Sequence, residues 1–100
     1  MPPPPALRQV VERRGRIADL QRQRAQYEAE IQAMDQEQTR IRQNMQQLDR
    51  QSALYQRYVA KLNDQETSIE KLRTEIRRLR DQETEALHSL QVYLDGLEVT

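Results

Sequence analysis

The chain contains no cysteine, tryptophan or phenylalanine, and only two of its 100 residues are glycine. Without cysteine it can form neither a disulfide framework nor a cysteine-based metal site. It also lacks a glycine-rich loop of the kind that cradles phosphate groups. No apolar run approaches the roughly 18 residues that a membrane-spanning helix needs, and no signal-peptide pattern is visible. These absences argue against a disulfide scaffold, a nucleotide-binding enzyme and a membrane-spanning protein.

What the chain has in abundance is charge and side-chain amide. Sixteen lysine and arginine residues balance sixteen aspartate and glutamate residues, and there are fifteen glutamines. One hundred residues of this composition allow one domain at most and are typical of a long, solvated helix. A net charge of zero argues against nucleic acid as the main ligand, because phosphate binding depends on an excess of basic side chains.

Apolar residues recur with a seven-residue period that has two apolar positions, here called seam positions. Upstream of residue 49 the seam positions are Val10, Ile17, Arg24, Ile31, Gln38 and Met45, together with Arg13, Leu20, Tyr27, Met34, Ile41 and Leu48. Downstream they are Tyr55, Leu62, Ile69, Ile76, Glu83, Leu90 and Leu97, together with Tyr58, Gln65, Leu72, Leu79, Ala86 and Tyr93. The two frames differ by an insertion of three residues. Either one long helix is locally overwound there, or the chain reverses.

Facing residues favour the reversal. When Leu48 is placed opposite Tyr55, the numbers of all facing seam residues add to 103, and Gln38 then falls opposite Gln65. Two facing amides could bond to each other, whereas a buried unpaired amide costs about 1–3 kcal/mol. The pattern therefore predicts an antiparallel helical hairpin in which Gln38 pairs with Gln65.

Charge gives a second argument for the same arrangement. Residues 1–25 carry a net charge of +4, and residues 81–100 carry a net charge of −5 with no basic residue. A hairpin brings these two ends together and places Arg24 and Glu83 in adjacent layers, where their charged groups could meet. An antiparallel dimer of unbroken helices would use the same pairs between two chains, so this domain-swapped alternative stays open.

The predicted fold class is all-α, an antiparallel two-helix coiled-coil hairpin that could dimerise into a four-helix bundle. We expect a proline-rich lead-in at 1–5, a first helix at 6–48, a turn at 49–54, a second helix at 53–95 and a tail at 96–100. Ser52 is a suitable N-cap for the second helix, and Gly96 is expected to end it. Leu54, Tyr55 and Tyr58 are expected to close the tip of the hairpin, where Leu48 faces Tyr55.

No residue pattern points to catalysis. His88 is the only histidine, and the carboxylates have arginines nearby but no predicted cleft. We therefore expect no catalytic, cofactor-binding or metal-binding residues and no small-molecule substrate.

Two groups of residues could instead bind a partner. Tyr55 and Tyr58 could anchor another protein at the tip, and Arg73 and Arg77 belong to an arginine cluster that could contact phosphate. Acidic residues near the cluster argue against nucleic acid.

Part of the chain resembles a known family. The elements Leu54-Tyr55-Gln56-Arg57-Tyr58 and Asp64-Gln65-Glu66-Thr67, and the ending Tyr93-Leu94-Asp95-Gly96-Leu97, are similar to the C-terminal helical region of large bacterial proteins of unknown function related to the mucoidy-inhibitor family. The resemblance covers roughly residues 20–99. It departs at Asp49, where the family carries proline.

This resemblance implies a segment of a longer, β-rich bacterial protein, in either the periplasm or the cytoplasm. The β-rich domains of that protein would then be intramolecular partners of the segment, and there are no catalytic residues to carry over.

The expected function is therefore that of a structural module, either a spacer or a self-association element that forms a homodimer. The alternative is a protein- or nucleic-acid-binding module that uses the tyrosine-bearing tip or an arginine-rich face.

Overall fold

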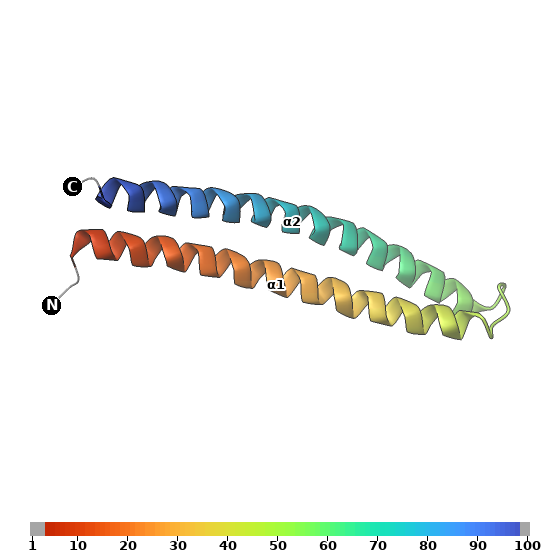
Figure 1. Cartoon of the computed structure of the whole chain (residues 1–100). Helices are drawn as coiled ribbons and strands as arrows, with labels where there is room; N and C mark the ends of the chain where they lie inside the picture. Colours follow the sequence, from red (N-terminus) through yellow and green to blue (C-terminus); the bar gives the residue numbers. More distant parts are fainter. Residues whose placement is uncertain (1–3, 99–100) are drawn as a thin grey trace. The chain divides into compact units, whose positions relative to one another are not determined.

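The computed structural model describes residues 4–98, which form an all-α helical hairpin. Helix α1 spans Pro5–Met45 and helix α2 spans Ala53–Glu98, with residues 46–52 between them (Figure 1). No strand occurs among the residues described. The predicted all-α hairpin is confirmed, because the helical backbone is interrupted between the two halves of the sequence.

Helix α1 begins at Pro5, which the sequence analysis had assigned to the lead-in. The backbone N–H of Arg8 donates to the carbonyl of Pro4 at 3.0 Å, and this bond closes the first turn. Proline suits the first helical position because the N–H that it lacks would have no partner inside the helix. The remainder of the predicted lead-in, residues 1–3, lies outside the described residues.

Helix α1 ends at Met45, three residues before the predicted end at Leu48. The N–H of Gln47 donates to the carbonyl of Asn44 at 3.2 Å, and the N–H of Leu48 donates to that of Met45 at 3.1 Å. Both bonds reach back three residues rather than four, which is the tighter turn that often finishes an α-helix. The segment between the helices is therefore 46–52 rather than the predicted 49–54.

Asp49 and Ser52 shape the reversal. The carbonyl of Asp49 accepts hydrogen bonds from the backbone N–H of Ser52 at 3.0 Å and from its hydroxyl at 2.7 Å. The Asp49 carboxylate accepts one from the N–H of Gln51 at 2.9 Å. The Ser52 Oγ in turn accepts the N–H of Tyr55 at 3.2 Å, so Ser52 is the N-cap of α2. Local side-chain bonds of this kind replace the glycine or proline usual in tight turns.

Helix α2 continues through Gly96 to Glu98, so the predicted stop at Gly96 is wrong. A glycine that ends a helix commonly adopts a positive φ, and no described glycine does so. Glycine inside a helix costs only about 1 kcal/mol relative to alanine, which is too little to end a well-patterned helix by itself. Gly15 lies within α1 for the same reason. Of the predicted tail, residues 99–100 lie outside the described residues.

The chain divides into two compact units. The tip unit is Gln26–Glu75, and the terminal unit combines Met1–Ala25 with Ile76–Thr100. Within each unit, a segment of α1 lies antiparallel beside a segment of α2 (Figure 1). Every buried apolar residue among those described occupies a predicted seam position: Ile17, Leu20, Ile76 and Leu79 in the terminal unit, and Ile41 and Ile69 in the tip unit.

Neither of the described helices contains a stretch with the length and hydropathy of a transmembrane segment.

Candidate interaction surfaces and polar seam residues

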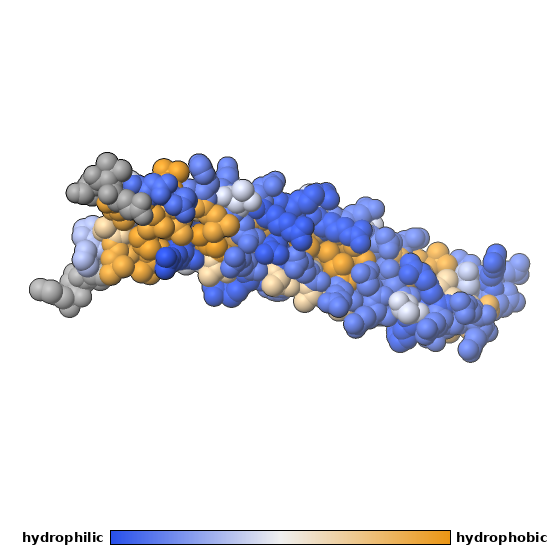
Figure 2. Space-filling model, in the orientation of Figure 1, coloured by the Kyte–Doolittle hydropathy of each residue, from blue (hydrophilic) through white to orange (hydrophobic). Residues whose placement is uncertain are grey.

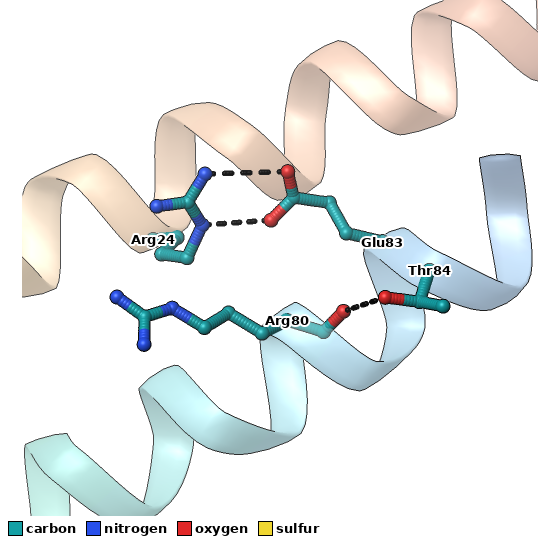
Figure 3. A network of polar contacts seen from close by, with 4 residues as sticks. All are labelled: Arg24, Arg80, Glu83 and Thr84. Carbon is teal, nitrogen blue, oxygen red and sulfur yellow. Dashed lines mark hydrogen bonds and ion pairs between the residues drawn. The ribbon is translucent and has the colours of Figure 1, made fainter.

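The terminal unit contains a charged pair at its seam. The Nε of Arg24 donates to Oε2 of Glu83 at 2.7 Å, and the Nη2 of Arg24 donates to Oε1 at 3.3 Å (Figure 3). Glu83 is 8% exposed, and Arg24 is half-buried. Two parallel bonds between a guanidinium and a carboxylate form the strongest geometry available to such a pair. The two groups meet as expected from their adjacent layers.

The surroundings of Glu83 keep its carboxylate ionised. The hydrogen bond from Arg24 lowers the pKa of Glu83, and burial opposes that shift. The positive charges of Arg24 and Arg80 and a hydrogen bond from Gln21 lower the pKa further. On the same helix, the carbonyl of Arg80 accepts the hydroxyl of Thr84 at 3.0 Å (Figure 3). A carboxylate held in this form is a structural anion rather than a proton donor.

The tip unit contains the two seam glutamines, but they do not pair as predicted. Gln65 Nε2 donates instead to Oε2 of Glu37 at 3.1 Å. The Nε2 of Gln38, whose residue is 3% exposed, and the Oε1 of Gln65 are buried and have no hydrogen-bond partner among the described residues. Glu37 takes the N–H of the Gln65 amide, because a carboxylate accepts a stronger hydrogen bond than an amide carbonyl.

Glu37 is the centre of a polar cluster beside the seam of the tip unit. Its Oε1 lies 2.5 Å from Nζ of Lys61 on α2 and 3.6 Å from Nη2 of Arg40 on its own helix. The hydrogen bond from Lys61 lowers the pKa of Glu37, while burial opposes the shift. The seam pattern does not predict the contact between Glu37 and Lys61, because neither is a seam residue. Their one visible signal is that each immediately precedes a seam residue.

The tyrosines at the tip are partly enclosed. Tyr55, Tyr58 and Leu48 are all half-buried, whereas Leu54 is 44% exposed and does not close the tip as predicted. Tyr55 lines a shallow depression together with Arg42, Met45, Gln46, Leu48 and Arg50. This enclosure reduces the aromatic surface that Tyr55 can offer to a partner.

The proposed phosphate-contacting arginines are both exposed. Arg73 lies in the tip unit and Arg77 in the terminal unit. Arg77 already takes part in a polar interaction within the chain.

A further polar contact lies in the terminal unit and was not predicted. The guanidinium carbon of Arg13 lies 4.8 Å from the centroid of the Tyr93 ring, and its Nη1 donates to Oγ of Ser89 at 2.5 Å. This is a cation–π contact between two seam residues. His88 is exposed, and no group of three potential metal-ligating residues occurs within residues 4–98.

Four strongly exposed hydrophobic residues are not predicted by the seam pattern, because none of them is a seam residue. The exposed fraction is 51% for Leu7, 61% for Val11, 50% for Leu87 and 56% for Val92. All four lie in the terminal unit.

Comparison with protein-family models, with curated proteins and with solved structures finds no match to this chain.

Proposed function

We propose that this chain is a structural coiled-coil module, a spacer or self-association element of a larger bacterial protein. The observation that carries the proposal is the Arg24–Glu83 pair, in which the most buried carboxylate among the described residues is bonded to a guanidinium of the neighbouring helix. A carboxyl group engaged in this way holds two helices together and is not available for proton transfer.

Burial along the seam supports the coiled-coil part of the proposal. With the exception of Leu97, every described seam residue is buried or half-buried, including polar residues such as Arg24, Gln38 and Glu83. A seven-residue seam sustained over two helices of 41 and 46 residues is what a coiled coil requires. The resemblance to the mucoidy-inhibitor relatives adds the expectation that the module would be attached to β-rich domains.

A charge swap tests the structural role. We expect Arg24→Glu alone to lower the midpoint of thermal unfolding, because it opposes two carboxylates at a poorly solvated position. The double variant Arg24→Glu, Glu83→Arg restores opposite charges and should recover most of the lost midpoint. Thermal unfolding followed by circular dichroism measures both. If the double variant is no better than the single one, the pair is not acting as a reciprocal structural contact and the proposal loses its main support.

One observation favours the alternative of a binding module. Arg42 and Arg50 line the same depression at the tip as the half-buried Tyr55, so two cationic groups lie beside an aromatic side chain. An acidic partner would bind there with an affinity that falls steeply with salt, whereas absence of binding to DNA or an acidic peptide at low salt would dismiss this alternative.

A further inference from the structure

The two sides of the terminal unit differ in polarity. Gln9 and Arg16 of α1 and Gln82 and Ser89 of α2 line a shallow groove on one side. Each of these four residues immediately precedes a seam residue. The residues that lie next to the seam on its other flank are therefore on the opposite side of the helix pair.

Near the start of α1 and the end of α2, the opposite side carries a group of apolar residues. Leu7 and Val11 lie four residues apart on α1 and so share a helix face, and Leu87 and Leu94 lie seven residues apart on α2. We call these four residues the apolar terminal face. Figure 2 shows hydrophobic residues gathered over the first turns of α1 and the last turns of α2. Leu7, Val11 and Leu87 are each at least half exposed, so this surface has no cover within the chain.

Charge indicates what could cover this face. The α1 part of the terminal unit carries a net charge of +4, and its α2 part carries a net charge of −2, made up of +3 over residues 76–80 and −5 over residues 81–100. Arg8 on α1 and Asp95 on α2 are both exposed, lie at the same level of the helix pair and carry opposite charges. A surface with one basic edge and one acidic edge is complementary to a copy of itself that is related to it by a two-fold axis parallel to the helices.

We propose that the apolar terminal face docks against the same face of a second copy of this chain, with α1 of each copy lying over α2 of the other. A two-fold axis parallel to the helices produces this arrangement and sets each basic segment against an acidic one. An axis perpendicular to the helices would set α1 against α1 and bring like charges together. The proposal rests on the proposed self-association function and names the surface and symmetry that carry it out.

The first test measures mass by sedimentation over a range of concentrations. We expect the wild-type chain to dimerise and the variant Val11→Glu, Leu87→Glu to weaken the dimer about tenfold or more. The matched control is Val92→Glu, which adds a charge at a similarly exposed valine on the groove side, seven residues after the groove residue Glu85, and should leave the dimer unchanged.

Two outcomes of this test would overturn the proposal. A wild-type chain that is monomeric at every concentration excludes the second copy and leaves another protein or a neighbouring domain as the occupant. A dimer disrupted by Val92→Glu but not by Val11→Glu, Leu87→Glu places the interface on the groove side. In both cases, intact helix content by circular dichroism shows that the proposed structural function survives, whereas loss of helix in the wild-type chain would sink that function itself.

The second test fixes the symmetry and uses the absence of native cysteine. Val11 of one copy should lie over the last turns of α2 of the other. We therefore expect a mixture of copies carrying Val11→Cys and copies carrying Gln91→Cys to form a mixed disulfide-linked dimer under mild oxidation. If copies carrying Val11→Cys link efficiently to each other instead, α1 lies over α1 and the proposed axis is wrong.

Discussion

The terminal and tip units are built on the same seven-residue seam, yet they accommodate polar seam residues in different ways. In the terminal unit, Arg24 and Glu83 form two hydrogen bonds and satisfy each other. In the tip unit, Gln38 and Gln65 each keep a buried polar atom without a partner. The comparison teaches that a polar residue in a thin core is tolerated when its partner has complementary geometry and charge, and is otherwise a source of instability.

The two units also differ in how completely their buried isoleucines are closed from water. In the tip unit, Ile41 and Ile69 are 0% and 1% exposed, whereas the terminal isoleucines Ile17 and Ile76 are 8% and 7% exposed. The exposed leucines and valines beside the seam lie mainly in the terminal unit. The isoleucines of the tip unit are therefore more completely closed from water, although Leu79 of the terminal unit is also only 1% exposed. The terminal unit retains apolar surface beside its seam that a second chain could cover.

Alanine substitutions at matched isoleucines should have the largest effect on stability. They test whether the isoleucines of the tip unit are more completely buried than those of the terminal unit. We expect Ile41→Ala to lower the free energy of unfolding by about 2–5 kcal/mol, because it opens a cavity in a fully buried position. Ile17→Ala should fall at the lower end of that range, because water already reaches its side chain. Urea unfolding followed by circular dichroism measures both variants. Equal losses, or a larger loss for Ile17→Ala, would contradict the difference in closure.

Replacing the unpartnered amides should have an intermediate effect, and it should raise rather than lower the free energy of unfolding. Gln38→Leu removes a buried amide nitrogen that has no acceptor, so we expect the free energy of unfolding to rise by about 1–3 kcal/mol. Gln65→Leu is the matched control, because it removes an unpartnered oxygen but also the hydrogen bond to Glu37, and should gain less. A loss of stability in Gln38→Leu would show that this amide is paired in solution.

The seam was predictable from the sequence because the spacing of apolar residues decides which side of a helix is buried. The same spacing placed Arg24 next to Glu83 and indicated the reversal between the two helices. Ser52 was visible as a cap because serine at that position satisfies an N–H that the helix cannot. These features depend on local geometry and on a pattern that repeats along the chain.

The features that were predicted wrongly, or not at all, depend on interactions of another kind. The early end of α1 depends on three-residue hydrogen bonds after Met45, and the continuation through Gly96 depends on how little one glycine costs. The Gln38–Gln65 pair failed because Glu37, outside the seam, reaches Gln65. The apolar terminal face was missed because its residues flank the seam. Each error involves a competing interaction that a list of seam positions does not contain.

Acid should produce the smallest effect, since the hydrogen bonds that lower the pKa values of Glu83 and Glu37 are opposed by burial in both cases. A carboxyl whose pKa is lower in the folded state stabilises that state at neutral pH. This stability declines as the pH falls below the unfolded-state pKa, which is about 4.3 for glutamate, and is lost once the pH passes the lowered folded value. We therefore expect the midpoint of thermal unfolding to drop between pH 7 and pH 3.

Glu83→Gln sharpens this prediction and extends the comparison between the units. The variant should be less stable than wild type at pH 7, because a neutral amide cannot replace the ionic bond to Arg24, and its midpoint should drop less between pH 7 and pH 3. Exposed Glu66 in the tip unit provides the control, since Glu66→Gln should leave the wild-type drop unchanged. If Glu83→Gln and wild type lose the same number of degrees on acidification, the terminal ion pair does not contribute to the pH dependence, and Glu37 with Lys61 in the tip unit becomes its main source.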